Sequence, residues 1–102
     1  MDNYGGSTAL HLAAWQGKDA VATQLVNANA NVNAVDNYTG DTPLHRAAAN
    51  GHAIVADLLL GAGANPKAAD KFGNTPEQDA EQGGHRELAE RLRQAESRVA
   101  ST

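Results

Sequence analysis

The chain has 102 residues, a formal net charge of −4 and no cysteine. This length supports one domain, and the excess of acid argues against nucleic acid or an anionic membrane as partner, because both require a basic patch. The absence of cysteine excludes disulfides and thiolate metal sites, and no apolar run approaches the ~20 residues that span a bilayer. We therefore expect a soluble intracellular protein, located in the cytoplasm. Apolar residues make up 41% of the chain but aromatic residues only 4%, which favours thin, closely packed helices.

Three polar loops that begin with aspartate divide the chain into repeated units. Asp2, Asp36 and Asp70 follow one another at intervals of 34 residues, so the units cover residues 1–35, 36–69 and 70–102 of a single domain. Aspartate, asparagine and glycine in these loops predict tight turns, since the polar side chains can bond their own backbone and glycine accepts positive φ. An internal repeat of this length outranks any isolated motif as a guide to the fold.

A threonine precedes the first helix of each unit. Its hydroxyl can cap a free N–H of the first helical turn, and proline, which lacks that N–H, follows it in units two and three. The capping residues are Thr8, Thr42 and Thr75, and they predict helices over 9–16, 43–50 and 76–83, ended by Gly17, Gly51 and Gly84. Gln78 completes a capping box with Thr75, and we expect the imidazole of His45 to bridge polar groups of the preceding turn.

A second helix follows in each unit, predicted over 19–28, 53–62 and 86–97. Its apolar residues recur with helical spacing and predict one stripe that faces the stack: Val21, Leu25 and Val26, then Val55, Leu59 and Leu60. Asn29 and Gly63, just after the first two of these helices, suit a left-handed helix end.

The last helix predicts a terminal cap, with one apolar side and one charged side. The apolar side includes Leu88, Leu92, Ala95 and Val99, and the charged side includes Arg86, Glu87, Glu90, Arg91 and Arg93. The spacing predicts i, i+4 pairs of Arg86 with Glu90 and of Glu87 with Arg91. At the other end Met1 directly precedes the first unit, which indicates an excised or designed piece whose Leu10, Val21 and Leu25 are open on that side.

The repeated motif resembles the ankyrin repeat over nearly the whole chain. The second unit carries the resemblance most fully, through Gly40, Thr42, Pro43, Leu44, His45, Ala47, Ala48, Gly51, His52, Ile54, Val55, Leu58, Leu59, Gly63, Ala64 and Asn65. The resemblance implies an all-α solenoid of stacked helix-turn-helix units with short hairpin-like loops, called fingers below. The third unit departs from the pattern with Glu77 and Gln78 in place of leucine and histidine. The first two fingers each contain one residue more than the usual unit, which we expect to change how they project.

The four histidines are the first candidates for catalysis or metal binding, because they titrate near neutral pH. All of them occupy repeat positions, namely His11, His45, His52 and His85, and the resemblance implies that they serve packing and hydrogen bonding between units. No pair has the i, i+4 spacing of helical metal ligands. We therefore expect no enzymatic activity, no metal and no cofactor.

The aromatic residues are more informative about function. Three of them occupy the third position of their unit, namely Tyr4, Tyr38 and Phe72. The fourth, Trp15, lies near the end of the first helix of the first unit, on what the resemblance makes the inner side. Exposed aromatics at regular positions are plausible binding hot spots. The alternative is that the finger rings only stack on one another, with Trp15 covering the open end.

The resemblance implies a concave partner surface made of finger and inner-helix residues. The candidates are Asn3, Tyr4, Ser7, Trp15, Gln16, Asn37, Tyr38, Asp41, Ala49, Asn50, Lys71, Phe72, Asn74 and Gln82. Such a mixture of aromatic and amide groups suits a protein or peptide. The sequence thus predicts a non-catalytic protein-interaction module. The alternative is an excised or designed scaffold without a native ligand, monomeric or weakly self-associating through its uncapped N-terminal face.

Overall fold

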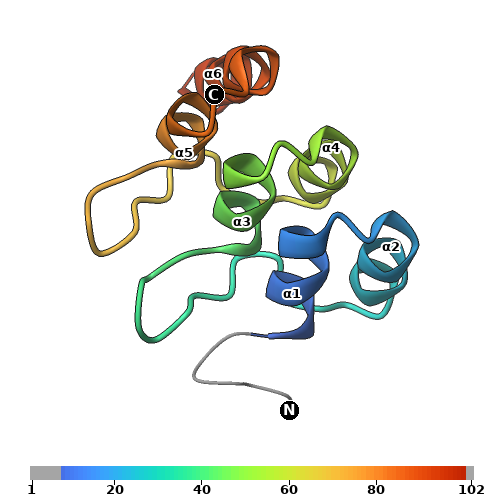
Figure 1. Cartoon of the computed structure of the whole chain (residues 1–102). Helices are drawn as coiled ribbons and strands as arrows, with labels where there is room; N and C mark the ends of the chain where they lie inside the picture. The colour runs from blue at the N-terminus through green and yellow to red at the C-terminus, as the bar shows by residue number, and fades with distance from the viewer. Residues whose placement is uncertain (1–7, 101–102) are drawn as a thin grey trace.

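The computed structural model describes residues 8–100, which form six helices in three successive pairs (Figure 1). The helices are α1 (Ala9–Gln16), α2 (Asp19–Asn27), α3 (Pro43–Ala49), α4 (Ala53–Gly61), α5 (Pro76–Gln82) and α6 (Arg86–Ala100). Helices α1, α3 and α5 stack as an inner layer and α2, α4 and α6 as an outer layer, while the loops before α3 and α5 project from the inner layer. No strand occurs in this part of the chain, so the predicted all-α stack is confirmed.

Local sequence sets the start of each inner helix, as predicted. Thr8, Thr42 and Thr75 have extended backbones, and each hydroxyl accepts a hydrogen bond from the backbone N–H three residues later. The side chains at those third positions accept in return from the threonine N–H, so all three helices begin with a capping box. We predicted the box for Gln78 alone; His11 and His45 complete the other two.

Helix ends differ from the prediction by one residue at four places. Helices α2 to α5 each stop one residue earlier, because Ala28, Asn50, Ala62 and Gly83 are caps, and α6 runs on to Ala100. The left-handed turns are confirmed: φ is 73° at Gly51 and 68° at Asn29. Glycine is also required at position 51 for steric reasons, since a Cβ there would lie 2.6 Å from the ring of His85 in the next unit.

Leucine and alanine make up most of the core between the two layers. Leu44, Leu59 and Leu92 are fully buried, and small alanines between them let the helices approach closely. Leu10 is only 1% exposed, so the expectation that it lies open is wrong: its side chain belongs to the same core cluster as Leu44. The expectation holds for Val21, which is 46% exposed while its equivalent Val55 is fully buried.

Helix α6 closes the stack with the predicted apolar side, because Leu88, Leu92 and Ala95 are buried. The side chain of Val99 lies outside the described part of the helix. The predicted i, i+4 ion pairs are wrong. Arg91 instead reaches Asp57 on α4 at 2.6 Å, and Arg93 binds Glu77 and Glu90 at 3.0 and 2.8 Å.

Candidate partner-binding surface

Each described finger is a tight turn held by its first aspartate. In the second unit the N–H of Asp36 donates to the carbonyl of Asp41 at 2.9 Å, and the Asp36 carboxylate accepts from the N–H of Tyr38 and of Thr39. In the third unit Asp70 accepts in the same way from Phe72 and Asn74. The aromatic residue therefore sits at a position that its own loop fixes.

The two finger rings point into solvent. Tyr38 is 74% exposed and Phe72 is 73% exposed, so neither ring covers the other. This exposure argues against the alternative in which the finger aromatics merely stack. Tyr4, with Asn3 and Ser7, lies outside the described residues.

The second and third fingers contact each other at Thr39, which has no counterpart in the third finger. Thr39 lies opposite the third finger, and its carbonyl accepts a hydrogen bond of 2.9 Å from the N–H of Lys71. The Lys71 ammonium group donates to the carbonyl of Asn37. Gly40 leaves room for this approach, since a Cβ there would lie 2.9 Å from the Lys71 nitrogen. The corresponding residue of the first finger lies outside the described range.

Buried histidines attach each unit to the finger of the next. The Nδ1 of His45 accepts from the N–H of Thr42, so its Nε2 carries the proton and donates to the carbonyl of Asn74 at 2.8 Å. His11 bonds the carbonyl of Asp41 in the same way, and burial holds the pKa of His11 below its usual 6.5. These contacts confirm the structural role expected for the two histidines, and they place Asp41 and Asn74 at the finger bases.

Trp15 forms the inner-helix part of the candidate surface. Its ring is half exposed and lies 5.8 Å from the guanidinium carbon of Arg46, within reach of a cation–π contact. Its carbonyl accepts from the side chains of Asn50 and His52 at 2.8 and 3.1 Å, so α1 is tied to the second unit here. Arg46, which no sequence pattern marked as part of this surface, also pairs with Asp36 and Asp41.

The other candidate residues differ in accessibility. Ala49, Asn50, Asp41 and Asn74 are partly buried, whereas Gln16, Asn37, Lys71 and Gln82 are exposed. The described candidates thus fall into two groups. One lies on the two adjoining fingers, and the other, Trp15 beside Arg46, lies on the inner helices. Two surface hollows of about 400 Å³, one beside His85 and one between α4 and α6, include none of the candidates.

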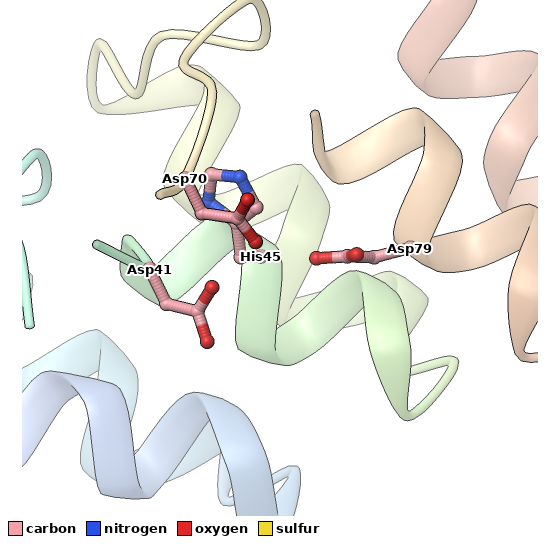
Figure 2. A group of neighbouring side chains, drawn as sticks. All are labelled: Asp41, His45, Asp70 and Asp79. Atoms are coloured by element: carbon pink, nitrogen blue, oxygen red, sulfur yellow. The ribbon is translucent and has the colours of Figure 1, made fainter. Parts of the chain in front are cut away.

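Four side chains between the second and third units could in principle hold a cation. Ligand atoms of Asp41, His45, Asp70 and Asp79 all lie within 4.8 Å of one another, and Figure 2 shows the carboxyl groups converging beside the imidazole. Both nitrogens of His45 already make hydrogen bonds, so coordination through this ring would break either the capping box or the bond to Asn74. The group therefore does not fit a metal centre that uses His45.

The carboxyl groups in this cluster have shifted pKa values. Burial raises the pKa of Asp79 to about 6, with further upward contributions from the charges of Asp41 and Asp70. For Asp70, burial is the largest influence and raises the pKa. Hydrogen bonds donated by the backbone N–H groups of Asn74 and Phe72 outweigh it and leave the pKa below its usual value.

Comparison with known proteins identifies the repeats. The family described as ankyrin repeats (3 copies) matches residues 10–102, while the comparison with curated proteins yields no match. Ankyrin repeats are generally protein–protein interaction modules and are typically non-catalytic. Within residues 8–100 no helix has the length and apolar character needed to cross a membrane. With three matching copies over most of its length, the chain belongs to the ankyrin repeat family.

Proposed function

We propose that this chain is a non-catalytic recognition module that binds a protein or peptide on its concave surface, formed by the fingers and the inner helices. The observation that carries the proposal is the pair of finger aromatics, Tyr38 and Phe72, which are about three-quarters exposed at equivalent positions of adjacent units. Large rings that already lie in water gain buried area on contact with a partner and have few rotors to fix.

The fingers are ordered before any partner arrives, which supports this function. Asp36 and Asp70 close their turns through several hydrogen bonds, and the backbone bond from Lys71 to Thr39 ties one finger to the other. A surface that is already rigid loses little conformational entropy on binding, so more of the contact energy appears as affinity.

The polar groups around the rings favour a partner that forms hydrogen bonds. Asn37, Lys71 and Gln82 are exposed, and Trp15 offers a further apolar surface beside Arg46. A protein or peptide surface with mixed apolar and hydrogen-bonding groups complements this arrangement.

The test is to select protein or peptide binders from a displayed library and to titrate them against single variants. Tyr38→Ala and Phe72→Ala should each weaken binding about tenfold or more, the cost typical of a hot-spot aromatic. Ile54→Ala is the matched control, because Ile54 is 66% exposed but lies on the outer helix α4. Far-UV circular dichroism should show unchanged helicity in all three variants.

Binders whose affinity is unaffected by both finger variants, or is weakened as much by Ile54→Ala, would place recognition away from the concave surface.

A second candidate is a scaffold without a native ligand that associates with itself through its N-terminal face. The exposed Val21, whose equivalent Val55 is buried, favours it. Light scattering over a wide concentration range would then give a molar mass that rises with concentration, and Val21→Lys should abolish the rise. A constant monomer mass would remove this candidate.

A further inference from the structure

The junction between the second and third units gathers carboxyl groups from three separate segments. Asp41 precedes the Thr42 cap, Asp70 opens the third finger and Asp79 lies on α5, yet their carboxyl oxygens come within 4.8 Å of one another (Figure 2). Like charges at this distance repel, and partial burial strengthens the repulsion by lowering the local dielectric constant.

In the second unit, the helix position equivalent to Asp79 carries a basic residue that balances the charge of nearby acids. Arg46 stands four residues after Thr42, as Asp79 stands four residues after Thr75. The guanidinium of Arg46 bonds Asp36 at 2.9 Å and Asp41 at 3.2 Å, thereby neutralising the acid of its own finger. In the third unit this position carries a carboxyl group beside Asp70, the residue equivalent to Asp36.

In the part of the chain that the structure describes, the cations near the cluster form an ion pair with only one of its three acids. From the second unit, Arg46 reaches only Asp41 among the three acids, and His45 uses both ring nitrogens in hydrogen bonds. On the third finger the Lys71 ammonium bonds the carbonyl of Asn37, and on α6 Arg93 is paired with Glu77, Glu81 and Glu90. Within residues 8–100 the Asp79 carboxyl group has no hydrogen bond or ion pair.

We propose that the junction between the second and third units is a proton-sensitive joint: a proton held by the Asp41, Asp70 and Asp79 cluster tightens the packing of the third unit on the second, and its loss loosens that packing. The joint does not depend on the binding function proposed above. It requires only that the acids repel one another when all are ionised.

The direction of the pH effect follows from Asp79. Burial raises its pKa from 3.8 to about 6 in the folded chain, so the folded state keeps a proton that the unfolded state has already lost. The stabilisation is therefore complete below pH 3.8 and is lost as the pH rises through about 6. At neutral pH the cluster opposes the packing of α5 against the second unit.

The experiment compares the intact chain with Asp79→Asn by urea unfolding from pH 7.5 to pH 4.5. At pH 7.5 the variant should have the more favourable folding constant, by about tenfold after allowance for solvent screening. The difference should shrink below pH 6, as the natural side chain takes up its proton. His11 is present in both proteins, so its own titration cancels in the comparison.

Two further variants separate the joint from a general effect of charge. Asp79→Arg copies the arrangement of the second unit and should likewise stabilise the chain at pH 7.5. Asp57→Asn removes an exposed acid on α4 that pairs with Arg91, and it should not stabilise the chain at pH 7.5.

Two local measurements complete the test. The carboxyl carbon of Asp79 should titrate in the NMR spectrum near pH 6. Amide protection, corrected for intrinsic exchange, should rise more in α5 and α6 than in α1 and α2 as the pH falls to 5. A titration midpoint near 4, a constant difference between the intact chain and Asp79→Asn, or equal protection changes in all four helices would overturn the proposal.

Discussion

The two bonds made by the His45 ring can be separated by substitution. Asparagine places its side-chain oxygen close to the position of Nδ1, so His45→Asn can keep the acceptor for the Thr42 N–H while losing the donor to Asn74. The Asn74 carbonyl still accepts from the N–H of Asp70, so no buried acceptor is left bare. The expected loss is that of one hydrogen bond and a little packing, about 1–2 kcal/mol.

His45→Ala should cost more, because it also removes the capping acceptor and leaves the N–H of the buried Thr42 without its partner. A loss of about 3 kcal/mol is expected. Gln78→Ala removes a more exposed capping side chain that makes no bond to another unit, and should cost about 1 kcal/mol or less. Urea unfolding followed by circular dichroism at pH 7.5 gives all three values. If His45→Asn is as stable as the intact chain, the bond between units contributes nothing and the reasoning is refuted.

Three other predictions test the stack. Leu44→Ala should lower the free energy of unfolding by about 2–5 kcal/mol through the cavity it leaves, and an unchanged urea midpoint would contradict the core assignment. Gly51→Ala should be more destabilising than Gly73→Ala. Both glycines have positive φ, but only Gly51 lies against a neighbouring ring, that of His85. Equal urea midpoints for the two variants would contradict that packing. Because burial lowers the pKa of His11, the contribution of His11 to stability is full above pH 6.5 and falls as the pH drops below 6.5, opposite in sign to the contribution of Asp79. His11→Asn should flatten this fall in a urea series from pH 7.5 to 5.5.

The features that the sequence predicts well are those decided within a few residues. Thr42 caps the helix that begins at Pro43, and Gly51 turns the chain after it, because both effects depend on the local backbone. The periodic repeat then places these local pieces in a stack. Where a predicted helix end differs from the observed end by one residue, the difference is whether the capping residue is counted as helical.

The features that the sequence did not reveal depend on contacts between units. Arg91 pairs with Asp57, far away in the chain, because α6 packs beside α4, and spacing within one helix cannot show this. The acid cluster is likewise not visible in any local pattern, since its members come from two units. The sequence does show that Arg46 and Asp79, which carry opposite charges, occupy equivalent positions of successive units. Interpreting this difference requires knowing which side chains lie beside each position. Whether the exposed aromatics bind a partner remains a prediction.

The bond from Lys71 to Thr39 has a mechanical consequence. It joins the two described fingers edge to edge, and the glycine at position 40 lets their backbones meet without a side chain between them. The two fingers are therefore mechanically coupled. We expect a displacement of the turn that carries Phe72 to be transmitted through this hydrogen bond to the neighbouring turn, which limits changes in the distance between the two turns.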